Sequence, residues 1–514
     1  MIRALGRRFE AFFAKVTPDP FVLAVLLTFV VFGLAFAIEG TSPLEIVRAW
    51  QSDAGFFGLL AFTMQMVLIL VTGHAVASAP TVRRGVRWLA SMPKSGASGA
   101  ALVAAVAMIA ALLNWGLGLI VGALLAREVG KALEARAIPA HYPLIVAAGY
   151  AGLMCWHGGL SGTAPLMVTN EADLVRFLGP ELAEGMAPLP FDHTVLTLGN
   201  AVVTGGLVVL VPLACWLLSP APDECASRSA TIGAVDEADE PPPPAKASVP
   251  GWLGPALWGI AALLTIFRER AFGDAIGWFV LAAAALVAVG GFAIAEVRVE
   301  RGLTIPERLE RSGVVGALLV FALAAACARW LLDNELAKLD PNAVSLAFLT
   351  LGLALHGNLR SYARAVDEAV RGAAGIVLQF PFYAGIMGVM RTTGLAASFA
   401  TSLASIAPAS LYTAMTFLSA GVVNLFVPSG GGQWAVQGPI AVRAAEALHV
   451  PLEQVVMAVA YGDQWTNMLQ PFWALPLLAI TGIKARDILG YTTLFLLIGG
   501  VWIAACLIVW ARLG

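Results

Sequence analysis

The feature that most constrains the fold of this chain is a polar, glycine-rich stretch placed where the sequence is otherwise hydrocarbon. It covers residues 424–434 and lies between the apolar runs 412–423 and 435–441. Three consecutive glycines (430–432) follow Pro428 there, and glycine and proline both disfavour a continuous helix. Irregular backbone at membrane depth occurs only where it is buried in protein or lines a water-filled cavity. We therefore predict the tip of a helical hairpin that dips into the bilayer, where free N–H groups and carbonyls can bind an ion.

The composition agrees with a membrane location for this stretch. Only 12% of the 514 residues are charged and 59% are hydrophobic, whereas a soluble domain is about one quarter charged. A glycine-rich turn in an aqueous loop is the alternative, but no charged residue lies between Met415 and Pro439. The five cysteines show no metal-ligand or disulfide spacing. We expect an all-α polytopic membrane protein with no cofactor and no nucleic acid partner.

The distribution of positive charge predicts the topology. Residues 1–16 suit a basic amphipathic helix in the headgroup layer, and the apolar run 21–38 suits a retained span. The segments 77–96 and 127–139 are basic and are expected in the cytoplasm with the N-terminus. The run 97–126 must then enter and leave the membrane on one side, as a hairpin does.

Apolar segments divide the chain into two membrane halves. Those near membrane thickness lie at about 20–39, 55–76, 141–169, 194–218, 252–267, 275–295, 312–331, 344–357, 372–390, 453–482 and 490–511. We predict a first membrane repeat at 1–218 with a hairpin near 97–126, an acidic, proline-rich cytoplasmic linker at 219–250, connecting spans at 251–343, and a second repeat at 344–514 with a hairpin near 411–445.

Four landmarks recur at a nearly constant offset. The pairs Gln65/Gln379, Asn114/Asn424, Tyr150/Tyr461 and Pro165/Pro476 are separated by 314, 310, 311 and 311 residues. By the charge distribution the two copies start from opposite sides of the membrane. This predicts an inverted repeat, which is typical of alternating-access transporters with the site at the repeat interface. Chance alignment of apolar sequence is the alternative.

Two further polar breaks interrupt predicted spans. One runs from Trp156 to Pro165 and the other from Tyr461 to Pro471. Unwinding exposes carbonyls and the positive N-terminal end of the following half-helix. Two hairpin tips facing two broken helices would form a small polar chamber near the bilayer midplane, suited to a carboxylate and an alkali cation.

Residues of these segments are the candidate site. Asp463 is an acid deep in a predicted span, where a functional role is the default; it could hold a proton, help coordinate Na⁺ or cap a half-helix. The candidate cation-coupling residues, with a possible Na⁺ at the hairpin tips, are Asn114, Asn424, Ser429, Asp463 and Asn467. The candidate substrate-binding residues are Asn114, Trp115, Gly116, Gly118, Trp156, His157, Ser161, Thr163, Ser429, Gly430, Gly431, Gly432, Gln433, Trp465 and Gln470.

Each of these side chains also has a structural interpretation. The neutral amides and hydroxyls could tie helices together, His157 could be a hydrogen-bonded packing residue, and the tryptophans could be interfacial anchors. The predicted chamber contains no buried arginine, which disfavours dicarboxylates and favours a singly charged acid.

Several motifs resemble the bacterial short-chain fatty acid transporter family, which includes acetoacetate and butyrate uptake carriers. They are FVPSGGGQWAVQGP (426–439), AYGDQW (460–465), QPFWALP (470–476), LQFPFYAGI (378–386), MQM (64–66) with VTGHA (71–75), and NWG (114–116). The resemblance implies membership of a broad ion-transporter superfamily with scaffold and transport domains, paired hairpins, elevator-type motion and frequent dimers. It also implies that the tips at 114–118 and 424–433 bind substrate and cation.

We therefore expect a secondary transporter of short-chain monocarboxylates such as butyrate or acetoacetate, driven by symport of H⁺ or Na⁺. We expect it in the bacterial inner membrane, as a homodimer with cytoplasmic N-termini. A carrier of another organic anion, such as a hydroxy acid or dicarboxylate, is the nearest alternative. A channel is less favoured, and so is an intramembrane enzyme using Ser429, His157 and Asp463, because no nucleophile elbow or phosphate loop is present.

Overall fold

The computed structural model describes residues 2–232 and 305–513, except 54, 170, 179, 185, 334–340, 371–372 and 405–407. The described residues form helices and loops and contain no strand. The predicted spans at 252–267 and 275–295, and the linker 219–250 beyond residue 232, lie outside the described residues. The chain divides into two compact units, which we describe separately.

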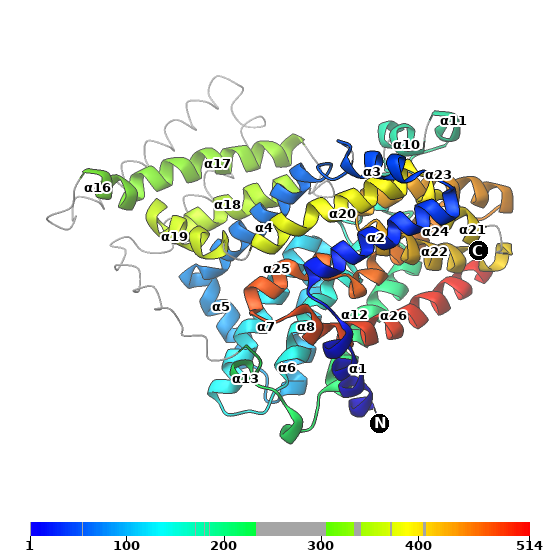
Figure 1. Ribbon diagram of the computed structural model, residues 1–514. Coiled ribbons are helices and arrows are strands. Elements are labelled where there is room, and N and C mark those ends of the chain that lie inside the picture. Colours follow the sequence, from blue (N-terminus) through cyan, green and yellow to red (C-terminus); the bar gives the residue numbers. More distant parts are fainter. Residues whose placement is uncertain are drawn as a thin grey trace. The chain divides into compact units, whose positions relative to one another are not determined.

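The first unit consists of residues 1–64, 89–233 and 374–514. Its N-terminal helices are α1 (Ile2–Val16), α2 (Pro20–Glu39), α3 (Pro43–Gln51), the start of α4 (Leu60–Ser78), the end of α5 (Pro80–Ser91), α6 (Gly96–Leu113), α7 (Trp115–Ala135), α8 (Tyr142–Tyr150), η1 (Ala151–Met154), η2 (Trp156–Gly158), α9 (Thr163–Leu166), α10 (Glu171–Leu178), α11 (Pro180–Ala183), α12 (Leu198–Leu218), η3 (Pro222–Glu224) and α13 (Arg228–Ile232). Its C-terminal helices are α20 (Ala374–Thr392), α21 (Leu395–Ala404), η6 (Ala409–Leu411), α22 (Tyr412–Phe426), α23 (Gly430–Leu448), α24 (Leu452–Thr466), η7 (Asn467–Leu469), α25 (Pro471–Thr481) and α26 (Ala485–Leu513). Figure 1 labels most of these elements.

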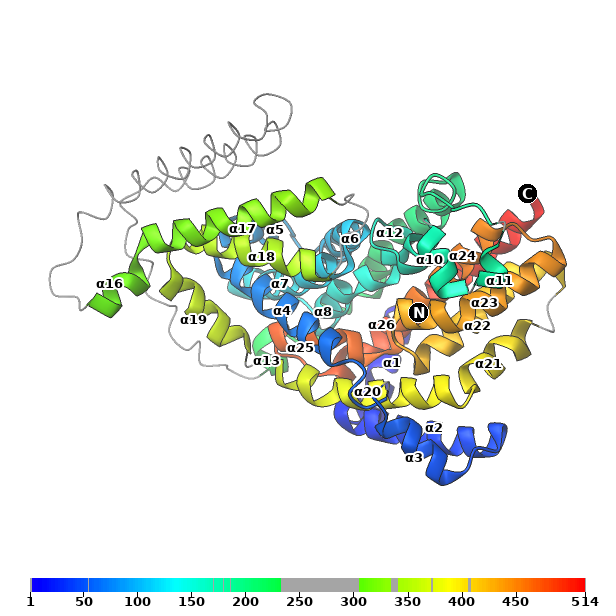
Figure 2. The same cartoon turned by 90° about the horizontal axis from the view of Figure 1, so that it is seen from above.

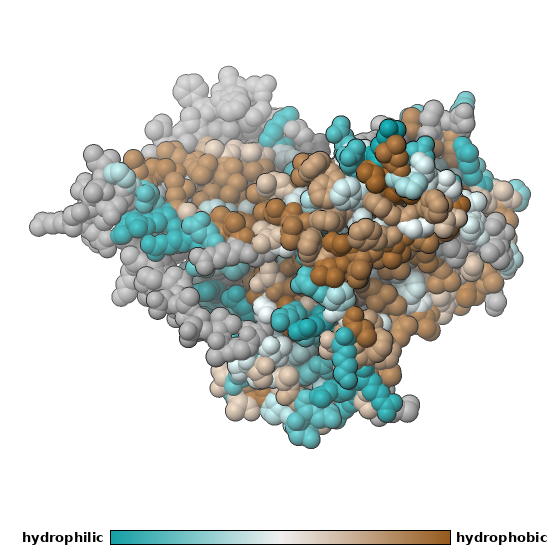
Figure 3. Space-filling view, viewed as in Figure 1, coloured by the Kyte–Doolittle hydropathy of each residue, from teal (hydrophilic) through white to brown (hydrophobic). Residues whose placement is uncertain are grey.

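The chain is a multi-pass membrane protein. Seven described helices are long and apolar enough to cross a membrane, and nine if each bent pair of helices forms one span. Helices α2 and α3 lie side by side along α20 (Figure 2), and the outer face of α2 exposes large apolar side chains such as Phe29 (66%) and Phe36 (58%). Figure 3 shows a hydrophobic surface on this face of the first unit, which suits contact with lipid tails.

The first hairpin turns at one residue. Helices α6 and α7 pack along each other, and Asn114 both ends α6 and caps α7. The helices approach closely because the contact residues are small: a Cβ added to Gly118 would lie 2.5 Å from the Cβ of Ala111. The break in the predicted run 97–126 is therefore a tight helix–helix turn.

The interruption between the two helices of the second hairpin starts later in the chain and covers fewer residues than the predicted stretch 424–434. Helix α22 continues through Asn424 to Phe426, and the three glycines 430–432 form the first turn of α23. Ser429 makes this possible, because its hydroxyl accepts a hydrogen bond from the Gly432 N–H and caps the new helix. The expectation that the glycines themselves interrupt the helix was wrong, and the interruption is limited to 427–429.

Each hairpin is followed by a broken helix. In the first, the segments Tyr142–Met154 and Trp156–Leu166 are bent by 41°. In the second, α24 ends at Thr466 and α25 starts at Pro471, where proline suits the first helical position. Asp463, which lies in the second predicted break, is therefore on a regular helix one turn before the interruption.

The second unit consists of residues 65–88 and 234–373. Its described helices are the remainder of α4, most of α5, α16 (Ile305–Arg311), α17 (Gly313–Asp333), α18 (Pro341–His356) and α19 (Leu359–Val370). Ala75, Leu353, Tyr362 and Ala365 form its buried core. The His356 ring links α18 to α4 through Nε2, which lies 2.8 Å from the Ala75 carbonyl oxygen.

Candidate functional site

Asn424 joins the second hairpin to the second broken helix. Its side-chain Nδ2 donates to the Asp463 carbonyl (2.6 Å), to the Thr466 hydroxyl (3.0 Å) and to Asn467 Oδ1 (2.9 Å). In return, Gln470 Nε2 donates to the Asn424 carbonyl. Asn424 is fully buried, so these bonds fix the end of α22 against α24 in an environment where an unpaired amide would be costly.

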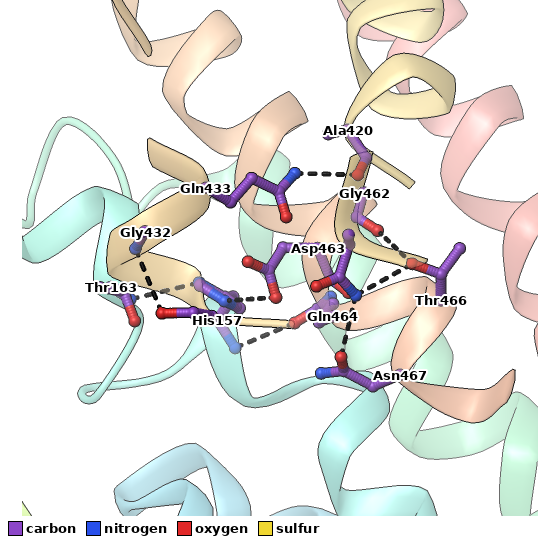
Figure 4. A network of polar contacts seen from close by, with 12 residues as sticks. His157, Thr163, Ala420, Gly432, Gln433, Gly462, Asp463, Gln464, Thr466 and Asn467 are labelled. Atoms are coloured by element: carbon purple, nitrogen blue, oxygen red, sulfur yellow. Dashed lines mark hydrogen bonds and ion pairs between the residues drawn. The ribbon is translucent and has the colours of Figure 1, made fainter. Parts of the chain in front are cut away.

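His157 and Asp463 meet beside this junction (Figure 4). His157 Nε2 lies 3.2 Å from Asp463 Oδ1, within ion-pair range but outside hydrogen-bond geometry. The His157 main-chain N–H donates to Gln464 Oε1 at 2.9 Å, and the ring Nδ1 accepts from the Thr163 N–H at 3.2 Å. The histidine is thus held by both broken helices, and Asp463 is 3% exposed.

The tip of the second hairpin packs on the same histidine. A Cβ added to Gly430 would lie 2.6 Å from Thr163 Oγ1 and 3.1 Å from His157 Cε1, so only glycine fits there without displacement. The Ser429 hydroxyl and carbonyl accept from the N–H groups of Gly432 and Gln433. Among the described residues, no acceptor pairs with the N–H groups of Gly430 and Gly431. Two free donors therefore lie at the start of α23, where Gly430 approaches His157 and Gly431 approaches Met167; an N-terminus of this kind suits an anion.

The tip of the first hairpin is closed by Asn114 of the tip and by Ser161 of the first broken helix. Asn114 Oδ1 accepts from the N–H groups of Gly116 (2.9 Å) and Leu117 (3.2 Å), and Ser161 Oγ accepts from the Trp115 N–H (3.1 Å). The Gly118 N–H donates to the Asn114 carbonyl. The structure brings these predicted residues together, but it uses their polar atoms within the tip. The two tips are therefore chemically different, and substrate binding at the first remains a prediction.

Several residues of this network carry a buried polar atom without a hydrogen-bond partner. Among the described residues these atoms are Asn424 Oδ1, Gln464 Nε2, Asn467 Nδ2, Gln470 Oε1 and Trp156 Nε1, and hydrogen bonds or ring contacts link their residues to one another or to His157. Native proteins leave few such groups unpaired. Donors and acceptors left over in this network suit a polar ligand or water.

Aromatic rings border the same region. The Trp156 ring packs against His157 at a tilt of 42°, with centroids 3.7 Å apart, and the Trp115 ring lies 6.2 Å from Trp156 and 5.4 Å from Trp473. Trp465 lies elsewhere: its Nε1 donates to the Leu496 carbonyl of α26 at 2.7 Å, and its ring packs on Phe417. Of the tryptophans in the candidate set, Trp115 and Trp156 are near the histidine, and Trp465 is a helix-packing residue.

The oxygens predicted for Na⁺ are largely engaged by the protein. Those of Asn114, Ser429 and Asn467 accept hydrogen bonds from protein N–H groups, whereas Asn424 Oδ1 has no partner. The described residues contain no cluster of three or more His, Cys, Asp or Glu side chains that could hold a metal ion. We assign no sodium ligands, and Na⁺ at the tips remains a prediction.

Sequence reasoning missed four connecting residues. The Tyr150 hydroxyl reaches the carbonyls of Asn467 and Gln470, both at 2.9 Å, and so ties the first broken helix to the second. The Tyr461 hydroxyl donates to Asn200 Oδ1 at 2.9 Å. Tyr150 and Tyr461 were landmarks of the repeat but were not assigned a role, and Asn200 could have been found as an amide within an apolar helix. Gln464 could have been found in the same way.

The sequence comparisons with known proteins all match transporters. The family model described as "Short chain fatty acid transporter" matches residues 1–240 and 286–510. A protein of Escherichia coli K12 named "Putative short-chain fatty acid transporter" is 35% identical over 502 residues, 98% of each chain. A protein of the same name from Haemophilus influenzae is 33% identical over 491 residues, 96% of each chain.

Two solved structures are similar to the chain at lower sequence identity. The Alcanivorax borkumensis YdaH transporter superposes with a TM-score of 0.42 and 16% identity, covering 97% of this chain and 99% of the other. Neisseria gonorrhoeae MtrF, described as illuminating a class of antimetabolite efflux pumps, has a TM-score of 0.33 and 13% identity, covering 99% and 97%.

Proposed function

The chain belongs to the short-chain fatty acid transporter family, and we propose on that basis that it carries short-chain monocarboxylates such as butyrate and acetoacetate by cation-coupled symport. The proposed setting is the bacterial inner membrane, with a cytoplasmic N-terminus and a homodimeric assembly. The observation that carries the proposal is the pair of free N–H groups of Gly430 and Gly431 at the start of α23, where Gly430 packs on His157.

A monocarboxylate suits the charges and hydrogen bonds of this region. One carboxylate can accept from the two amides at the start of α23, where the helix dipole favours a negative charge. Among the described residues, neither His157 nor Asp463 contacts a lysine or arginine, so a second carboxylate would lack a cation. The rings of Trp156 and Trp115 offer an apolar surface for a short alkyl chain.

The cross-links between the broken helices suggest how such a carrier moves. Tyr150 holds the second break, and Tyr461 bonds Asn200, which in turn bonds the Gly158 carbonyl in the first break. We propose that the two halves form an inverted repeat and that the hairpins and broken helices move together as a transport domain in an elevator motion.

An enzyme is not supported. The family consists of transporters, and Ser429, the nucleophile of the predicted alternative, uses its hydroxyl to cap α23. The relatives also make a carrier of unrelated anions the weaker alternative.

Counterflow in proteoliposomes tests the function. Liposomes loaded with unlabelled butyrate are diluted into trace labelled acetoacetate, and protein-free liposomes measure the leak of the neutral acids. A carrier transiently concentrates the label, butyrate competes, and succinate or citrate does not. Label entry equal to that of protein-free liposomes would refute transport, non-saturating flux would indicate a channel, and competition by succinate alone would indicate the dicarboxylate alternative.

A further inference from the structure

We propose that transport is coupled to one proton per carboxylate, that Asp463 carries this proton, and that His157 stays neutral throughout the cycle. This rests on the proposed function and deepens it, because the proposed function leaves the coupling ion open. The observations that carry it are the partners of the two ring nitrogens of His157 and the absence of a cation beside Asp463 in the described residues.

The protonation state of His157 follows from its hydrogen bonds. Nδ1 accepts a hydrogen bond from the Thr163 N–H at 3.2 Å, so this nitrogen carries no hydrogen. An imidazolium ring has hydrogens on both nitrogens and accepts at neither. The ring is therefore assigned as the neutral form with its hydrogen on Nε2, and this nitrogen lies 3.2 Å from Asp463 Oδ1. A hydrogen on Nδ1 would face the hydrogen of the Thr163 N–H, and two donors would then point at each other.

The charge of Asp463 is then uncompensated. Among the described residues, His157 is the only basic side chain within ion-pair range of its carboxyl group. Asp463 lies on α24, which packs against α9, α22, α23, α26, η1, η2 and η7. Among the side chains that the structure describes, the charged ones on these elements are Glu453 at the start of α24, the exposed Arg443 and Glu446 on α23, and the paired Arg486 and Asp487 at the start of α26, and none of them is within ion-pair range of Asp463. The neutral titratable side chains are Tyr412, Tyr461, Tyr491 and Cys506. An ionised Asp463 therefore leaves this buried region with a net charge of −1.

A bound substrate cannot simply add to that charge. Its carboxylate would bind at the start of α23, where Gly430 packs on the histidine that Asp463 also contacts, and two anions in a poorly solvated site repel strongly. Transfer of one proton to the Asp463 carboxylate removes one of them. This proton enters from the side that supplies the substrate and leaves on the side that receives it.

The charge balance makes the cycle electroneutral. The empty carrier holds ionised Asp463, with one negative charge, and the loaded carrier holds neutral Asp463 and one carboxylate, again with one negative charge. The same charge crosses the membrane in both directions, so the net movement is one proton with one carboxylate.

Proton uptake on binding tests the assignment directly. Isothermal titration of detergent-purified full-length protein with butyrate, in buffers of different ionisation enthalpy and in sodium or choline salts, gives the number of protons taken up per bound anion. We expect one for the native protein in either salt, one for Asp463→Glu, one for His157→Gln and none for Asp463→Asn. In the native protein affinity should fall about tenfold per pH unit once the free carboxyl is ionised, and in Asp463→Asn it should not change.

The outcomes separate the two proposals. Butyrate binding without proton uptake, or only with sodium, would overturn proton coupling and leave the transporter function standing. Loss of proton uptake in His157→Gln with retention in Asp463→Asn would overturn the assignment to Asp463. A monodisperse Asp463→Asn protein that no longer binds would also contradict it, because asparagine resembles the protonated acid. Absence of binding by the native protein would instead refute the proposed function.

Discussion

The contact between the second hairpin tip and the first broken helix predicts different effects for two neighbouring glycine substitutions. In Gly430→Ala the new Cβ would lie 2.6 Å from Thr163 Oγ1, 3.0 Å from Thr163 Cβ and 3.1 Å from His157 Cε1. In Gly431→Ala it would lie 2.8 Å from Met167 Cε and 3.7 Å from Thr163 Cγ2. Met167 Cε is the end of a flexible side chain and can move, whereas Thr163 and His157 are held by hydrogen bonds.

The expected magnitudes follow from these contacts. Overpacking of this kind costs about 1–3 kcal/mol, and alanine recovers at most about 1 kcal/mol as a better helix former than glycine. If the tip moves off His157 to relieve the overlap, binding weakens by the same free energy, roughly 5- to 150-fold. Gly431→Ala should stay within about 0.5 kcal/mol of the native protein in stability.

The assay compares both variants with the native protein. Butyrate affinity is measured by isothermal titration, and folding by thermal unfolding in the same detergent. Removing the crowded hydroxyl in Gly430→Ala/Thr163→Ala should restore part of the lost affinity, giving a coupling energy above about 0.5 kcal/mol. Equal affinities for the two single variants, or additive effects in the double variant, would show that the tip does not pack on Thr163 and His157 as described.

Four further substitutions test the surrounding network. Asn424→Ala removes one amide that reaches three acceptors, and we expect it to destabilise the protein by about 2–4 kcal/mol in thermal unfolding; a cost below 1 kcal/mol would contradict this. Tyr150→Phe loses two hydrogen bonds to the second break, so counterflow should slow and stability should fall by about 1–3 kcal/mol; native behaviour in both would show that the cross-link is not needed. Trp465→Phe should lower stability without changing KM, because the indole bonds α26, whereas Trp156→Phe should change KM; the reverse pattern would place Trp465 at the substrate.

Local patterns in the sequence predicted the breaks in this fold. Asn114 and Pro471 lie at chain interruptions because an asparagine cap and a proline act on their own neighbours, and such effects can be read from the sequence. The helical state of the glycines 430–432 was not predictable in the same way. It depends on the cap made by Ser429 and on a close approach to Thr163, which is a tertiary contact.

The candidate site was predicted residue by residue but not as pairs. His157 and Asp463 stood out as ionisable groups in apolar runs, yet only the packing of the two broken helices brings them within 3.2 Å. Trp465 shows the opposite error: it lies at a break in the sequence, but its helix turns it toward α26. The closing of the first tip by Asn114 and Ser161 also required the fold, because these residues come from different elements.

The self-bonded first tip also limits how many substrates one chain can bind at once. Two anions bound at tips that interact or that differ in affinity would give sigmoidal or biphasic saturation curves. Here the amides at Trp115, Gly116 and Leu117 are already used by the protein, so under the proposed function we expect one carboxylate per chain, bound at the second tip. Uptake should therefore follow a simple hyperbola with a Hill coefficient near one, and an inhibitor that occupies that one tip should block the whole chain.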